Sequence, residues 1–156
     1  MIDAGYAADE YWEHPPNLNR LTSAELLALP HTAFLHYMTA SRAFRETIYG
    51  VSAARAMDLP PRFGNGRALD FGCGVGYDSV SLAERGWQMS LVDLHAGNRR
   101  GAARWLEGLG FDTTETALAD LPTKWFSLVL SYGVLHHIEN VEPVIRRLQN
   151  AVAVGG

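Results

Sequence analysis

The fold of this chain is decided by residues 68–78, which read ALDFGCGVGYD. The short apolar run around Asp70 is typical of a buried β-strand, and the glycine-rich turn after it leads into a helix. Glycines stand at alternate positions, Gly72, Gly74 and Gly76. Because residues without a Cβ atom let the backbone come close to a ligand, this stretch predicts a strand, a ligand-binding turn and a helix.

The residues within this turn indicate what kind of ligand it would bind. The dinucleotide fingerprint G-x-G-x-x-G needs a glycine at position 77, where this chain has Tyr77. A carboxylate at Asp70 would repel a pyrophosphate, but it could bind a cationic amino group, directly or through water. We interpret Cys73, the single cysteine, as a small side chain in a tight space, with a reactive thiol as the alternative.

Strands and helices alternate in the second half of the chain. Apolar runs predict strands at residues 67–71, 89–92, 113–118 and 126–130, with helical patterns between and after them. This alternation predicts an α/β fold, in which a parallel sheet is connected by right-handed crossovers.

The first 64 residues show helix signals and little strand character. Residues 22–25 read TSAE, a capping box that predicts a short helix. From Thr32 onward, apolar residues at helical spacing predict a longer helix that packs on the main domain: Phe34, Tyr37, Met38, Phe44, Ile48 and Val51. Prolines and glycines at positions 60–66 predict a linker. We therefore expect a helical segment at 1–64 and an α/β domain at 65–156.

Composition and charge exclude several partners. The chain has 156 residues, a net charge of −4 and no basic block, which argues against a nucleic-acid substrate. It has one cysteine, no signal peptide and no apolar run of about 18 residues. We expect a cytoplasmic protein without a membrane segment.

Two more carboxylates follow predicted strands. Asp93 ends the second strand, where a carboxylate can accept hydrogen bonds from both hydroxyls of a ribose; a helix-capping role is the alternative. NAD-binding domains use the same device, so Asp93 indicates an adenosine-type ligand without naming it. Asp120 follows the third strand, and a surface turn is the alternative there.

Together these features resemble the class I S-adenosylmethionine (SAM) dependent methyltransferases. The resemblance covers residues 66–156 and rests on four segments in the family's order, at 68–78, 91–94, 118–122 and 131–138. The last segment, SYGVLHHI, is similar to the V-L-H-H-I/V stretch of small-molecule methyltransferases, including the quinone-biosynthesis type. The chain departs from the family at Ser127, where an aspartate is usual.

The resemblance implies a Rossmann-like three-layer sandwich with strand order 3-2-1-4 and an N-terminal helical lid. It implies SAM as the cofactor, S-adenosylhomocysteine (SAH) as its product and a small-molecule methyl acceptor. Asp93 would hold the ribose, Leu94 would wall the adenine pocket, and Asp120 would accept a hydrogen bond from the adenine amino group. The SAM-binding residues would be Asp70, Gly72, Cys73, Gly74, Gly76, Asp93, Leu94, Asp120, Leu121 and Ser131. Arg42 or Arg45 could meet the methionine carboxylate, although exposed helical arginines are common.

The paired histidines at positions 136 and 137 suggest proton transfer rather than metal binding. Histidine titrates near neutrality, so His137 is the candidate general base, with a packing or substrate-lining role as the alternative. We expect no metal site, because adjacent residues at a strand end point in different directions and no cysteine or carboxylate stands at ligand spacing.

The family's fold has seven strands, whereas this sequence predicts four. We therefore expect a truncated domain without the C-terminal strands, and a homodimer in which the partner covers the edge of the fourth strand. Two other functions stay open: a SAM-binding domain without catalysis, or inactive fragment, and an NAD(P)-dependent oxidoreductase.

Overall fold

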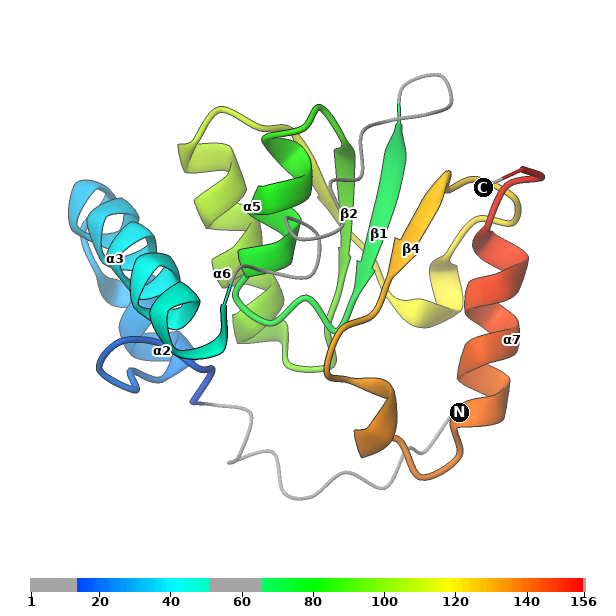
Figure 1. Ribbon diagram of the computed structural model, residues 1–156, viewed down its shortest axis with the longest axis horizontal. Helices are drawn as coiled ribbons and strands as arrows, with labels where there is room; N and C mark the ends of the chain where they lie inside the picture. The colour runs from blue at the N-terminus through cyan, green and yellow to red at the C-terminus, as the bar shows by residue number, and fades with distance from the viewer. Residues whose placement is uncertain (1–13, 51–65, 156) are drawn as a thin grey trace.

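A computed structural model describes residues 14–50 and 66–155 of the chain. Its centre is a four-stranded parallel sheet with the order β3-β2-β1-β4, which confirms the predicted order (Figure 1). The strands are β1 (Arg67–Phe71), β2 (Gln88–Val92), β3 (Thr113–Glu115) and β4 (Leu128–Leu130). Val51 and most of the predicted linker lie outside the described residues.

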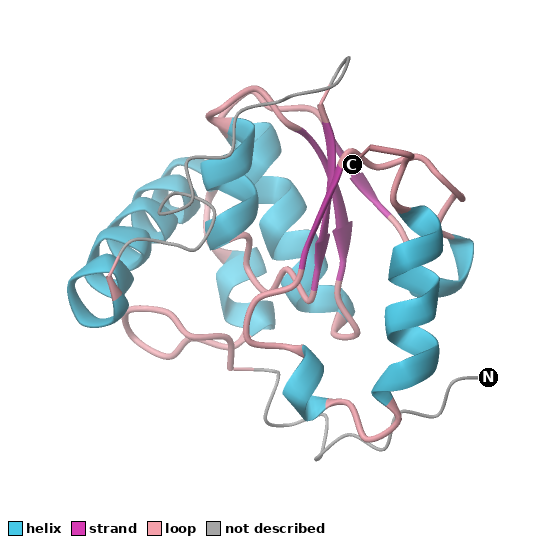
Figure 2. Cartoon of the chain, turned by 45° about the vertical axis from the view of Figure 1, so that its right-hand side comes forward, coloured by secondary structure: helices cyan, strands magenta, loops and turns pink. Residues whose placement is uncertain are grey.

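Helices cover both faces of the sheet, as the resemblance implied. Helices α5 (Tyr77–Ala83) and α6 (Ala96–Gly108) lie on one face, and α7 (Val141–Ala151) lies on the other (Figures 1 and 2). Two buried clusters fill the spaces between these layers. Along β1, Ala68 belongs to the cluster under α5 and α6, whereas Leu69 and Phe71 belong to the cluster under α7, as the alternation of a strand requires.

The N-terminal helices α2 (Ser23–Ala28) and α3 (His31–Tyr49) form an outer layer beyond α5 and α6 (Figure 1). The capping box is present, because the Thr22 side chain accepts from the Glu25 N–H while the Glu25 carboxylate accepts from the Thr22 N–H. Phe34 and Met38 are fully buried in the cluster that also contains Trp105 of α6.

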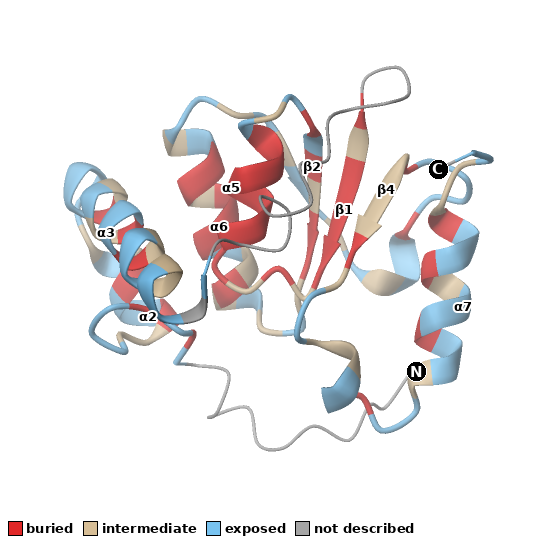
Figure 3. Cartoon of the chain, in the orientation of Figure 1, coloured by how far each residue is buried: buried red, intermediate tan, exposed pale blue. Residues whose placement is uncertain are grey.

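The second half of the predicted apolar stripe on α3 is exposed, so that part of the prediction is wrong. Phe44 and Ile48 have 43% and 54% of their surface accessible. Figure 3 shows much of α3 in the colour of exposed residues. The reason is that this part of α3 meets α5 through polar groups: the Arg42 guanidinium donates to the Glu84 carboxylate and to the Ser81 hydroxyl.

Two predicted strands are shorter in the structure. The third ends at Glu115 and is followed by a single 3₁₀ turn at Leu118–Asp120. The fourth begins at Leu128, because Phe126 forms a parallel bridge with Val152, beyond α7. The approach to β4 is therefore paired on its outer side by the same chain, and Ala153 N–H donates to the Phe126 carbonyl at 2.8 Å.

No helix in the described ranges combines the length and the apolar character needed to span a membrane.

Candidate active site

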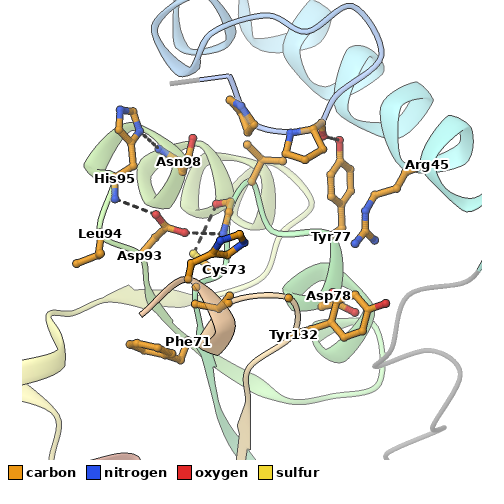
Figure 4. Close-up of a pocket in the computed structure, with 18 residues that line it drawn as sticks. Arg45, Phe71, Cys73, Tyr77, Asp78, Asp93, Leu94, His95, Asn98 and Tyr132 are labelled. Atoms are coloured by element: carbon orange, nitrogen blue, oxygen red, sulfur yellow. Dashed lines mark hydrogen bonds between the residues drawn. The ribbon is translucent and has the colours of Figure 1, made fainter. Parts of the chain in front are cut away.

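A cavity of about 260 Å³ opens at the carboxyl ends of the strands (Figure 4). Its walls come from the turn after β1, the end of β2, the segment after β4 and the N-terminal segment. In the sheet, β2 lies on one side of β1 and β4 lies on the other, so the strand order reverses at β1. The cavity lies at this topological switch point, which is where open α/β sheets bind their ligands. The lining residues are Pro15, Pro16, Arg45, Phe71, Gly72, Cys73, Gly74, Val75, Tyr77, Asp78, Asp93, Leu94, His95, Asn98, Tyr132, Gly133, Val134 and His137.

The glycine turn is fixed to the end of β2 and is tightly packed. The N–H groups of Gly72 and Cys73 both donate to the Val92 carbonyl, at 2.7 and 3.1 Å. A Cβ atom on Gly72 would stand 2.1 Å from the side chain of Val134, and one on Gly76 would stand 2.9 Å from Ala102 of α6. Glycine is therefore required at positions 72 and 76, because Val134 and Ala102 pack where a Cβ atom would stand. Gly76 does not line the cavity.

Asp93 is held with its carboxylate at the cavity wall. Its Oδ2 accepts from the Gly74 N–H at 2.8 Å and its Oδ1 accepts from the His95 N–H at 2.9 Å (Figure 4). Burial raises the pKa of Asp93, and these two donors oppose that shift. Each carboxylate oxygen has a second lone pair and can accept one more hydrogen bond.

The helix-capping alternative for Asp93 is wrong. The side chain that caps α6 belongs to His95, whose Nδ1 accepts from the Asn98 N–H at 3.3 Å. The sequence reasoning did not single out His95 or Asn98. The signal that could have found them is the start of a helix directly after the aspartate that ends β2, because the first residues of that helix then lie at the same edge of the sheet.

Asp70 lies beneath the turn and does not line the cavity. It is 3% exposed, and its carboxylate accepts from the Ser79 hydroxyl of α5 at 2.5 Å. Burial raises the pKa of Asp70 to about 7, against the opposing hydrogen bond from Ser79.

Cys73 lines the cavity but is 7% exposed. Burial raises the pKa of its thiol well above the ordinary value. Because the nucleophilic form is the thiolate, this environment favours the interpretation of Cys73 as a small packing residue.

Of the three residues predicted around adenine, one lines the cavity and two do not. Leu94 lines the cavity with 65% of its surface exposed. Asp120 is exposed and Leu121 is buried under α7, and neither lines the cavity. The guanidinium of Arg147 on α7 donates to the carbonyls of Leu118, Ala119 and Leu121, which ties this segment to the opposite face.

The segment after β4 forms an open wall. Tyr132 is 56% exposed and His137 is also exposed, and both line the cavity. Partial burial and the neighbouring His136 lower the pKa of His137, which favours the neutral imidazole that a base requires. Ser131 does not line the cavity, and its hydroxyl is buried without a hydrogen-bond partner among the described residues.

The N-terminal segment supplies the remaining wall through Pro15, Pro16 and Arg45. The Tyr77 hydroxyl donates to the Pro16 carbonyl at 2.9 Å, and the Arg45 guanidinium lies 5.1 Å from the centre of the Tyr77 ring. Of the two arginines considered from the sequence, Arg45 therefore reaches the cavity. The sequence offered no pattern for the two prolines, which tertiary contacts bring there.

Among the described residues, no group of three or more His, Cys, Asp or Glu side chains is arranged to hold a metal ion.

The fold is a Rossmann-like domain with a cavity at its topological switch point. A family model described as a methyltransferase domain matches residues 34–156, and the chain belongs to this family. Its fold is that of the class I SAM-dependent methyltransferases.

Individual relatives agree with this assignment. An uncharacterized methyltransferase of Mycobacterium tuberculosis is 32% identical over 108 residues, which cover 64% of this chain and 52% of the relative. The chain thus spans about half the length of the curated relatives it matches.

Solved structures show the same fold. A TehB-like SAM-dependent methyltransferase from Corynebacterium glutamicum has a TM-score of 0.58 at 22% identity, over 80% of this chain and 70% of that one. A SAM-dependent methyltransferase from Mesorhizobium loti has a TM-score of 0.52 at 30% identity, over 65% of this chain and 47% of that one.

Proposed function

We propose that this domain binds SAM in the cavity and takes part in transfer of its methyl group to a small-molecule acceptor. The observation that carries the proposal is the Asp93 carboxylate, held by two backbone N–H groups with its free lone pairs available to a ribose. Leu94 would cover the adenine face, and the Gly72–Gly74 backbone would pass beside the methionine part. Asp70, Gly76, Asp120, Leu121 and Ser131 would act on the cofactor only by shaping these walls or through water.

The acceptor would enter beside the segment after β4. SAM supplies an electrophilic methyl group on a sulfonium and leaves as SAH. Tyr132 and His137 are exposed at this side, so a neutral His137 imidazole would take the proton of an O–H or N–H acceptor. Pro15 and Pro16 would limit the acceptor's size, which makes the N-terminal segment, 1–64, a lid that contributes to the substrate pocket. A small acceptor suits the volume of the cavity and the absence of a basic block in the sequence.

The test is isothermal titration of the chain with SAM and SAH. We expect micromolar binding to the wild type and loss of about 100-fold or more in Asp93→Ala, because two charge-assisted hydrogen bonds are removed. Asp112→Ala, at an exposed position, is the matched control. A well-folded wild type that binds neither ligand would contradict the proposal.

Two further measurements separate the other functions. Binding of SAH without turnover in an acceptor screen would favour a non-catalytic SAM-binding domain. Binding of NADH, followed by its fluorescence, would favour an oxidoreductase instead.

A homodimer that covers the outer edge of β4 is also part of our proposal. Parallel pairing beside this edge begins at Phe126 and Val152, and β4 is the last strand of the four-stranded sheet on this side. Edges of this kind invite pairing with another chain. Light scattering at micromolar concentration would show a dimer mass, and a monomer mass would refute it.

A further inference from the structure

Two adjacent prolines, Pro15 and Pro16, bring the N-terminal segment to the cavity wall. Proline has no backbone N–H group, so neither residue can donate a hydrogen bond to a ligand from its backbone. This Pro15–Pro16 wall therefore acts on a ligand mainly through its shape and its position. Its position depends on the groups to which the two prolines are bonded.

Asn17 holds the first of these prolines. Its Nδ2 donates to the Pro15 carbonyl at 2.7 Å and to the Leu21 carbonyl at 2.8 Å. Its Oδ1 accepts from the Leu21 N–H at 2.9 Å and from the hydroxyl of Tyr37 on α3. A side-chain amide has two N–H donors and an oxygen with two lone pairs, so Asn17 uses its full hydrogen-bonding capacity. It is 9% exposed and does not line the cavity.

Two more hydrogen bonds attach the same segment to the helices. The Leu18 N–H donates to the hydroxyl of Ser41 on α3 at 3.2 Å. The Tyr77 side chain points from α5 toward the N-terminal segment, and its hydroxyl donates to the Pro16 carbonyl at 2.9 Å (Figure 4). The segment is thus bonded to α3 through Tyr37 and Ser41 and to α5 through Tyr77.

We infer that Asn17 is a positioning residue for the cavity: it keeps the Pro15–Pro16 wall in place without lining the cavity itself, and the Tyr77 hydroxyl is the second attachment of this wall. The inference rests on the proposed function only in taking the ligand to be SAM or SAH. Asparagine is an ordinary loop residue, and what distinguishes Asn17 is its contacts with Pro15 and Tyr37.

Removal of the Asn17 amide should make the wall open more often. The groups that it satisfies, which include the Pro15 carbonyl and both backbone groups of Leu21, would lose this partner in a partly buried place. Unpaired groups of this kind destabilise the closed arrangement, whereas in an open arrangement they can bond to water. Local opening that exposes the cavity then becomes more populated, while the rest of the domain stays folded.

Cys73 can report this opening without any ligand. It is the single cysteine of the chain, it lines the same cavity, and it is 7% exposed. We expect Asn17→Ala to speed the labelling of the Cys73 thiol by a maleimide by about 10-fold. Tyr77→Phe should speed it by about threefold, because one hydrogen bond is lost.

The matched control is Asn19→Ala, an exposed asparagine two residues farther along the same segment. Asn19 donates from its backbone N–H to the Tyr37 hydroxyl, and the substitution keeps that bond. Asn19→Ala should therefore label at the rate of the wild type. Equal labelling rates in Asn17→Ala and Asn19→Ala would overturn the inference.

A destabilised control separates a role at the wall from a general loss of stability. Val144→Ala removes buried apolar volume under α7, on the other face of the sheet. It should lower the urea unfolding free energy without speeding the labelling of Cys73 in the folded protein. Asn17→Ala that labels no faster than Val144→Ala would show only a structural role. If Asn17→Ala does not fold, Tyr77→Phe decides by the same comparison.

The outcomes also separate this inference from the proposed function. With SAH bound, Asn17→Ala should release it about 10-fold faster in stopped-flow, and an unchanged rate would overturn the positioning role. Faster labelling of Asn17→Ala, with no SAH binding by the wild type, keeps the role of Asn17 at the wall and rejects the SAM site. SAH binding by the wild type, with no change of labelling in Asn17→Ala, keeps the SAM site and rejects the inference.

Discussion

The turn after β1 and the segment after β4 meet the same cavity from the same edge of the sheet, but they are built differently. The turn is closed: two of its N–H groups bind the end of β2, and two of its three glycines, Gly72 and Gly76, pack against Val134 and α6. The segment after β4 is open: Tyr132 and His137 are exposed, and a Cβ atom added to Gly133 would meet no described neighbour within 4 Å.

We propose that the two regions have different tasks. A constant part of a reaction is served by groups held in place before binding, because binding then costs less ordering. Variable substrates are served by open surfaces with few internal contacts. The closed turn therefore suits the cofactor and the open segment suits the acceptor, and the following variants test that division.

The largest effect is expected from the buried carboxylate beneath the turn. The pKa of Asp70 is about 7 in the folded protein and 3.8 in its ordinary state, so the folded state binds more protons between these values. Wild-type stability should therefore fall as pH rises from about 4 to above 7, by on the order of 4 kcal/mol. Asp70→Asn should lack this fall, measured as the difference in urea unfolding free energy across pH.

At the β4 end the same register position is held by Leu130, which does not titrate. The prediction is wrong if the difference in unfolding free energy between wild type and Asp70→Asn stays constant over this pH range. Ionisation of Asp70 would then not destabilise the folded protein.

The glycines of the two regions should respond differently to alanine. Gly76 has a φ of +91° and a close contact with Ala102, so Gly76→Ala should cost about 2–4 kcal/mol of unfolding free energy. Gly133 has a φ of +71° in open space, so Gly133→Ala should cost about 1 kcal/mol, from backbone strain alone. Equal costs, measured by urea unfolding, would erase the contrast between closed and open regions.

Leu94 tests the cofactor wall separately from stability. Because its side chain is 65% exposed, Leu94→Ala should change the unfolding free energy by less than about 0.5 kcal/mol. It should weaken SAH binding by about fivefold in isothermal titration, because apolar cover is lost from the ligand. Unchanged affinity would place the adenine elsewhere in the cavity.

The smallest effect on cofactor binding is expected at the open segment. His137→Gln should bind SAH within about twofold of the wild type, because the proposed function places His137 beside the acceptor. With an acceptor in hand, the same variant should lower the transfer rate by about 100-fold, as loss of a general base does. A large loss of SAH affinity instead would move His137 to the cofactor side.

Several elements could be predicted because their signals are local. The span of β1 and the capping box at Thr22 follow from neighbouring residues, and the structure confirms both. The division of the α3 stripe could not be predicted, because it depends on which side of α3 meets α5, where Arg42 contacts Glu84 while Phe44 is exposed.

The candidate site divides in the same way. Gly72, Cys73, Gly74, Asp93, Leu94 and His137 line the cavity as the sequence reasoning expected, since strand ends of a parallel sheet meet at one edge. Asp120 and Ser131 follow strands too, but Arg147 ties the Asp120 segment toward α7, and the Ser131 hydroxyl is buried away from the cavity.

By itself, the sequence determined the class of fold, the strand order through its family motifs, and the turn and strand ends where the cavity lies. It could do so because hydrophobic periodicity and glycine spacing act over a few residues. Only the tertiary structure decided that Pro15, Pro16, Arg45 and Asp78 share one cavity, and that two of the three glycines serve packing. Those facts depend on how distant helices pack, and such contacts leave no local pattern in the chain.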